Sequence, residues 1–153
     1  MRAHREKILV DSTFLLPLVG VEVVGFPENP LEMMLDLGFN IMINEISLFE
    51  AVGKAMREAA KAHNREKITK RIEIGVKSLL LDTGIEKFPI CELETINTVI
   101  KLCESGLDDL PNCFIAATAA LHTGLLLTES EDVKPAAQKA DIPLKIVKWK
   151  DLT

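Results

Sequence analysis

Short apolar runs alternate along this chain with longer stretches in which apolar residues recur every three or four positions. A short apolar run between turn residues is typical of a buried strand, and the recurring spacing is typical of an amphipathic helix. The runs predict strands over residues 7–11, 40–44, 88–90, 125–128 and 145–147. The spacing predicts helices over residues 31–37, 46–62, 92–103, 112–122 and 131–140, and one more that begins after residue 64 and ends around 82–84.

Strands that alternate with helices indicate an α/β domain with a mainly parallel sheet. No linker or change of composition divides the chain, so we expect a single domain over residues 1–153. The buried face of the helix over residues 46–62 is expected to consist of Ile46, Phe49, Val52 and Met56.

Two helix starts carry capping signals. Ser12 or Thr13 can cap a short helix through residues 14–16, because a side-chain oxygen there can accept from a free backbone N–H. Asp109 precedes Pro111 by two residues, which is the pattern of an Asx cap with proline in the first turn.

The overall composition favours a folded acidic protein. The 153 residues are 48% hydrophobic and carry a formal net charge of −5, which excludes intrinsic disorder and a protein that coats nucleic acid by bulk charge. No stretch reaches the roughly 18 apolar residues of a membrane span, so we expect no membrane insertion and a cytoplasmic location. Cys91, Cys103 and Cys113 form no Cys-x-x-Cys pair, and we expect buried, reduced thiols.

The charge is unevenly distributed. Residues 54–77 hold eight basic residues against three glutamates, a net charge of +5, which leaves −10 for the rest of the chain. One interpretation is a solvated helical surface with Glu–Lys pairs, and the other is a positive arm that contacts RNA phosphates. No aromatic residues are interleaved with these charges, so a base-stacking surface is not indicated.

Several polar residues fall where predicted strands end or helices begin. Asp11 ends the first strand, Asn112 begins a helix, and Ser130 and Asp132 follow the fourth strand, while Glu50 lies in the helix after the second. Ligands of a parallel α/β sheet bind at the carboxyl ends of its strands. Each residue alone favours a turn or cap, but several acids at one edge indicate a divalent cation such as Mg²⁺. A generic flavodoxin-like binder is less favoured because the sequence has no phosphate-binding loop.

Four stretches together resemble a PIN domain, the nuclease fold of the toxins in VapBC-type toxin–antitoxin pairs and of many archaeal proteins. Residues 8–16 resemble the family's opening strand with its first acid, and residues 46–54 its Ser/Thr-x-x-Glu helix. Residues 112–119 are similar to its Asp-x-x-Ile-Ala-Ala helix, and residues 125–132 to its strand followed by Thr-x-Asp/Asn. The resemblance implies a three-layer α/β/α domain around a mainly parallel sheet of about five strands. It also implies hydrolysis of RNA phosphodiester bonds that depends on Mg²⁺ or Mn²⁺.

The resemblance places the family's acidic cluster on Asp11, Glu50, Asn112 and Ser130, with Asp132 beside it. The cluster is degenerate, because Asn112 stands where the family has Asp and Ser130 where it has Asp or Asn. The implied catalytic residues are Asp11, Glu50, Asn112 and Asp132, and the implied metal ligands are Asp11, Glu50 and Asp132. Glu45 is a rival to Glu50, which fits the motif spacing better. The candidate RNA contacts are Thr13, Thr128, Ser130, Lys54, Arg57 and Lys61.

Two hypotheses follow from these residues. In the first, the protein is a metal-dependent ribonuclease, with a toxin of a toxin–antitoxin pair as one interpretation. In the second, it is a catalytically impaired PIN-fold module that binds RNA or protein. The expected partners are RNA, an antitoxin protein and a second copy of the chain in a homodimer.

Overall fold

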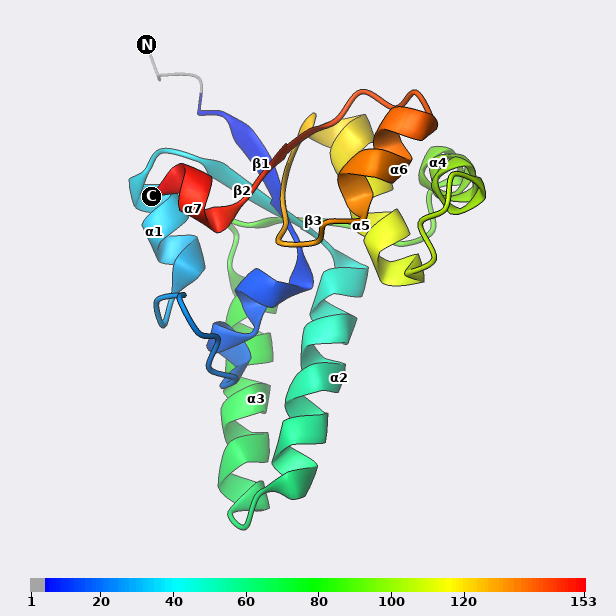
Figure 1. Ribbon diagram of the computed structural model, residues 1–153. Coiled ribbons are helices and arrows are strands. Elements are labelled where there is room, and N and C mark those ends of the chain that lie inside the picture. Colours follow the sequence, from blue (N-terminus) through cyan, green and yellow to red (C-terminus); the bar gives the residue numbers. More distant parts are fainter. Residues whose placement is uncertain (1–4) are drawn as a thin grey trace.

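A sheet of five short parallel strands forms the centre of the protein in the computed structural model, which describes residues 5–153 (Figure 1). The strands are β1 (Lys7–Val10), β2 (Asn40–Asn44), β3 (Glu86–Phe88), β4 (Leu125–Leu127) and β5 (Lys145–Val147). Their order across the sheet is β3-β2-β1-β4-β5, and every neighbouring pair is parallel. The chain therefore builds outward from β1 in both directions, which creates a switch point between β1 and β4, where ligands of such sheets bind.

Helices cover both faces of this sheet and make three layers. They are η1 (Ser12–Leu15), η2 (Pro17–Val19), α1 (Pro30–Asp36), α2 (Glu45–Lys61), α3 (Arg65–Leu81), α4 (Leu93–Glu104), α5 (Leu110–His122), α6 (Val133–Lys139) and α7 (Trp149–Leu152). Alternate strand residues enter opposite cores: Ile8 packs with η1 and α1–α3, whereas Leu9 packs with α4–α6. The predicted three-layer α/β/α fold with a five-stranded parallel sheet is confirmed.

The helices α2 and α3 form an antiparallel hairpin that projects well beyond the sheet (Figure 1). The predicted buried face of α2 was wrong, because Phe49 is 68% exposed and small residues form the buried stripe instead. This stripe consists of Ser47, Ala51, Ala55 and Ala59. Small side chains at every fourth position let the backbone of α2 approach its neighbours closely, and the larger apolar residues lie at the edges of the contact.

A close backbone approach fixes α3 against the segment that follows β1. A Cβ atom at Gly75 would lie 2.1 Å from the carbonyl oxygen of Leu18 in η2. Only glycine permits this contact without displacement of one of the two backbones. This contact therefore fixes the end of the hairpin nearest the sheet against the segment that follows Asp11.

The sequence patterns missed some details of the fold. Strand β3 ends at Phe88, two residues before the predicted end, because Pro89 has no N–H to continue the ladder. Helix α7 was not predicted, and its Trp149 packs against Phe14 and Phe26 with ring centroids 5.9 and 5.6 Å away. None of the helices within residues 5–153 is both long and apolar enough to cross a bilayer.

Candidate active site

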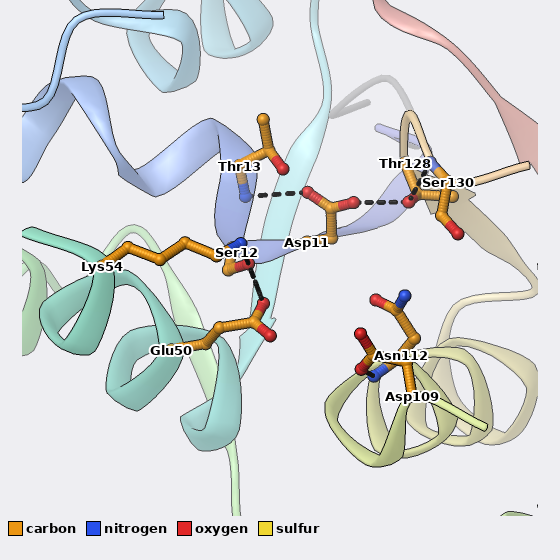
Figure 2. Close-up of polar contacts among 9 residues, drawn as sticks. All are labelled: Asp11, Ser12, Thr13, Glu50, Lys54, Asp109, Asn112, Thr128 and Ser130. Carbon is orange, nitrogen blue, oxygen red and sulfur yellow. Dashed lines mark hydrogen bonds and ion pairs between the residues drawn. The ribbon is translucent and has the colours of Figure 1, made fainter.

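Asp11 lies at the carboxyl end of β1, next to the switch point of the sheet, and only 5% of it is exposed. Its Oδ1 atom accepts a hydrogen bond of 2.9 Å from the backbone N–H of Thr13, and its Oδ2 atom accepts one from the hydroxyl of Thr128 (Figure 2). Asp11 is thus the N-cap of η1, and the predicted cap at Ser12 or Thr13 was wrong. Aspartate suits this position because one carboxylate oxygen can cap the helix while the other faces the edge of the sheet.

The pKa of Asp11 is raised to about 6, chiefly because burial disfavours its charged form and to a smaller extent because of the negative charge of Glu50. The hydrogen bonds from Thr128 and Thr13, together with the positive charge of Lys54, lower this pKa and so act in the opposite direction. A carboxylate in such a place is poorly solvated. Binding of a proton or another cation therefore stabilises it.

Glu50 approaches Asp11 from α2. Its Oε1 atom accepts a hydrogen bond from the hydroxyl of Ser12, and the Nζ atom of Lys54, one helical turn later, is 3.7 Å away from the same oxygen (Figure 2). The contact between Ser12 and Glu50 was not predicted, because it depends on how α2 packs against η1.

Asn44 positions the start of α2. Its Oδ1 atom caps the helix by accepting from the N–H of Ile46 at 2.8 Å, and its Nδ2 atom donates to Thr118 of α5 at 2.7 Å. Both Asn44 and Thr118 are buried, so this pair fixes α2 against α5 in the core. Sequence reasoning missed the pair, although an Asx residue directly before the helix was a visible capping signal.

The opposite side of the site begins with α5. Asp109 caps this helix as predicted, and its Oδ1 atom accepts from the N–H of Asn112 at 3.0 Å. In Figure 2 the side chains of Asp109 and Asn112 lie across from those of Asp11 and Glu50. Asn112 therefore presents a neutral amide where a third carboxylate would complete the cluster.

The loop after β4 closes the site through a chain of hydrogen bonds. The hydroxyl of Thr128 accepts from the N–H of Ser130 at 3.1 Å, and the hydroxyl of Ser130 accepts from the N–H of Asp132 at 3.4 Å. Asp132 itself is exposed at the start of α6. Within residues 5–153, no three or more His, Cys, Asp or Glu side chains are grouped closely enough to hold a metal ion.

The donor set can nevertheless accommodate Mg²⁺ or Mn²⁺. Mg²⁺ is commonly held by one or two carboxylates and takes its remaining ligands from water and substrate phosphates. Asp11 and Glu50 supply two carboxylates, and the amide oxygen of Asn112 is a neutral donor across from them. A bound cation would also offset the burial that disfavours the charged form of Asp11.

The candidate RNA contacts divide between the site and the hairpin. Thr13 lies at the site, and Lys54 lies beside Glu50 with 39% of its side chain exposed. Arg57 and Lys61 are exposed farther along α2, and the Nζ atom of Lys61 is 3.2 Å from Glu58 Oε1. Positive charge therefore begins next to the acids and continues outward along the projecting hairpin.

No family model matches the sequence, and no curated protein matches it significantly. Several solved structures, however, have a similar fold. VapBC2 from Rickettsia felis, bound to a DNA fragment from its promoter, has a TM-score of 0.56 at 16% identity and covers 94% of this chain and 98% of its own. FitAcB from Neisseria gonorrhoeae has a TM-score of 0.55 at 18% identity, with 91% and 95% covered. A toxin–antitoxin complex from Klebsiella pneumoniae has a TM-score of 0.50 at 19% identity, with 82% and 88% covered.

These likenesses show the fold. The chain has the architecture of a PIN domain, the domain that forms the toxin component of such complexes. The resemblance drawn from the sequence motifs is therefore confirmed at the level of the fold.

Proposed function

We propose that this protein is a metal-dependent ribonuclease of the PIN type, which hydrolyses RNA phosphodiester bonds with Mg²⁺ or Mn²⁺. The observation that carries the proposal is the meeting of Asp11 and Glu50, from β1 and α2, at the switch point of the sheet. Each carboxylate accepts a hydrogen bond from the short segment that follows β1, Asp11 from Thr13 and Glu50 from Ser12.

Asp11 and Glu50 would hold the cation, and the amide oxygen of Asn112 would face it. The cation, when bound, supplies positive charge to the phosphate and lowers the pKa of a water molecule. Thr128 and Thr13 fix the two oxygens of Asp11, so that the carboxylate does not have to reorganise when a substrate arrives. Asp132 would contribute least, because it is exposed on the outer end of the loop after β4.

The RNA backbone would follow the positive charge along α2. Lys54 can exchange its contact with Glu50 for a phosphate oxygen, and Arg57 and Lys61 extend the same path along the hairpin. Thr128 and Ser130 line the other side of the site. Because the path holds charges and no aromatic platform, it is suited to phosphates more than to particular bases.

A protein partner is part of the proposal. The structural neighbours are toxin–antitoxin complexes, which supports an antitoxin-like partner for this chain. Leu93, Ile96 and Ile100 form an exposed apolar row on α4, with 75%, 37% and 51% of each residue accessible. Such a row suits contact with an antitoxin or with a second copy in a homodimer.

The second candidate function is an RNA- or protein-binding module without efficient catalysis. It is favoured by Asn112 and Ser130, two neutral residues at positions where the family resemblance implies acids that hold a metal. An amide can ligate a metal but cannot accept a proton from water at neutral pH.

One assay distinguishes the two functions. The purified chain is incubated with single-stranded RNA and Mn²⁺ or EDTA, beside Asp11→Asn and the exposed control Asp36→Asn. The nuclease proposal expects Mn²⁺-dependent fragments from the wild type and from Asp36→Asn, and none from Asp11→Asn. Equal cleavage by Asp11→Asn would reject the assigned site. RNA binding without fragments in Mn²⁺ would favour the binding module.

A further inference from the structure

Two of the three cysteines meet at the contact between α4 and α5. The Sγ atoms of Cys103, in the last turn of α4, and Cys113, in the first turns of α5, are 3.3 Å apart. Both are free thiols. A disulfide needs an S–S distance of about 2.05 Å, so the two sulfur atoms have to approach by only a little more than 1 Å.

The two thiols differ in a way that suits stepwise oxidation. Cys103 is exposed and can be reached by a dissolved oxidant, whereas Cys113 is buried. The Sγ atom of Cys113 donates its hydrogen to the carbonyl oxygen of Leu107 at 3.2 Å and lies in contact with the Sγ atom of Cys103. Burial raises the pKa of Cys113 to about 12, so Cys103 is the thiol that reacts first and the attack by Cys113 is the slow step. Cys91 is also exposed, but no other cysteine within residues 5–153 is in contact with it.

We propose that Cys103 and Cys113 are a redox modification site, at which a peroxide forms an intramolecular disulfide. The peroxide first oxidises Cys103 to a sulfenic acid and leaves as water. The sulfur of Cys113 then attacks the sulfenic sulfur, an S–S bond replaces the S–OH bond, and the hydroxyl leaves as a second water with the proton of Cys113. Two thiols and one hydrogen peroxide thus give one disulfide and two water molecules.

The crosslink would join two helix ends across a short connection. The loop between Cys103 and Cys113 contains the turn at Gly106 and the cap of α5 at Asp109. Closure of a loop of this size lowers the conformational freedom of the unfolded chain and stabilises the native state. The expected rise in melting temperature is about 5–10 °C.

The test exposes the reduced full chain to a small excess of hydrogen peroxide, then counts thiols and maps crosslinked peptides by mass spectrometry under non-reducing conditions. We expect the wild type to lose two of its three thiols, to lose about 2 Da of mass per chain, and to yield a linked Cys103–Cys113 peptide. Cys91→Ser is the matched control and should form the same link with the same rise in melting temperature. Cys103→Ser, which changes only an exposed residue, should form no intramolecular link.

Three results would overturn the proposal. The first is a wild type that forms only disulfides between chains, and the second is a linked peptide that contains Cys91. The third is a Cys103–Cys113 crosslink that lowers the melting temperature, because it would mean that the native contact does not suit the bond.

Discussion

The two sides of the candidate site differ in charge and in how firmly they are held. On the β1–α2 side, Asp11 and Glu50 are carboxylates, and each accepts hydrogen bonds from the segment that follows β1. On the opposite side, Asn112 and Ser130 are neutral, and the acids near them, Asp109 at the cap of α5 and Asp132 in the loop after β4, are both exposed. In the proposed site, only two of the four positions to which the sequence resemblance assigns acids carry a charge, so the two sides of the site can be compared directly.

The neutral side has a physical advantage when no cation is bound. The charge of Glu50 already raises the pKa of Asp11, and a third carboxylate facing them would raise it further. Asn112 removes that repulsion and gives up part of the attraction for a divalent cation. In the proposed site we therefore expect less repulsion without metal, and weaker metal binding, than a full set of acids would give.

Glu50→Gln should have a large effect on catalysis, as Asp11→Asn should, because it removes one of the two charges on the carboxylate side. We expect RNA cleavage with Mn²⁺ to fall by roughly 100-fold or more while circular dichroism stays unchanged. Glu45→Gln, at an exposed position five residues earlier in α2, should cleave like the wild type. If Glu45→Gln lost activity and Glu50→Gln kept it, the two glutamates would have been assigned the wrong way round.

Gly75→Ala should have the largest effect on stability, because the added methyl group meets the carbonyl of Leu18 at 2.1 Å. We expect a loss of about 3 kcal/mol or more in the free energy of unfolding, measured by urea denaturation. Gly53→Ala in α2 is the matched control, since its Cβ would meet nothing closer than Arg57 at 3.6 Å. That control should be neutral or slightly stabilising, because alanine favours a helix more than glycine does. Equal stability of Gly75→Ala and the wild type would contradict the close contact between Gly75 and the carbonyl of Leu18.

Asn112→Asp tests the neutral side directly by restoring a charge to it. We expect cleavage with Mn²⁺ to rise by about tenfold, because a third carboxylate strengthens the hold on the cation. In EDTA the same variant should be slightly less stable than the wild type, since its charge then repels Asp11 and Glu50. Asn97→Asp, on the exposed surface of α4, should change neither property. A fall in Mn²⁺-dependent cleavage in Asn112→Asp would show that the amide itself is required.

Lys61→Gln should have the smallest effect, because Lys61 lies far along the hairpin and is partly neutralised by Glu58. We expect RNA affinity to fall about twofold to threefold and its salt dependence to weaken, as measured by fluorescence anisotropy at several ionic strengths. Lys139→Gln, exposed in α6, should bind RNA like the wild type. Identical affinities of Lys61→Gln and the wild type at low salt would mean that RNA contacts the edge of the sheet and not the outer part of the hairpin.

Local sequence patterns were sufficient for the sheet and its layers but not for the packing of α2. Four of the strands contain a short apolar run that ends at a turn or a polar residue, so they could be located without knowledge of tertiary contacts. Strand β3 begins with Glu86 and Lys87, and its prediction over residues 88–90 was two residues too late. The face of α2 was misjudged because large apolar residues were expected inside. The alanines at 51, 55 and 59 pack there instead, and Phe49 remains outside.

The residues of the candidate site could be named from the sequence, but the hydrogen bonds among them could not. Asp11, Glu50 and Asn112 could be named because they end a strand or fall within short motifs of fixed spacing. The contacts of Ser12 with Glu50 and of Thr128 with Asp11 join residues 38 and 117 positions apart, so only the folded chain reveals them. The Cys103–Cys113 contact was missed for the same reason, and the expected burial of all three thiols was wrong for Cys91 and Cys103.

Direct measurement of Mn²⁺ binding to the purified chain tests the central claim, that the carboxylate side of the site holds a divalent cation. Isothermal titration at pH 7.5 should show one site per chain. Affinity should fall about tenfold at pH 5, because Asp11, with a pKa of about 6, then carries a proton that the metal must displace. Asp11→Asn should bind at least tenfold more weakly at pH 7.5 and lose most of this pH dependence. Equal binding by Asp11→Asn and the wild type, or no binding by either, would contradict the account.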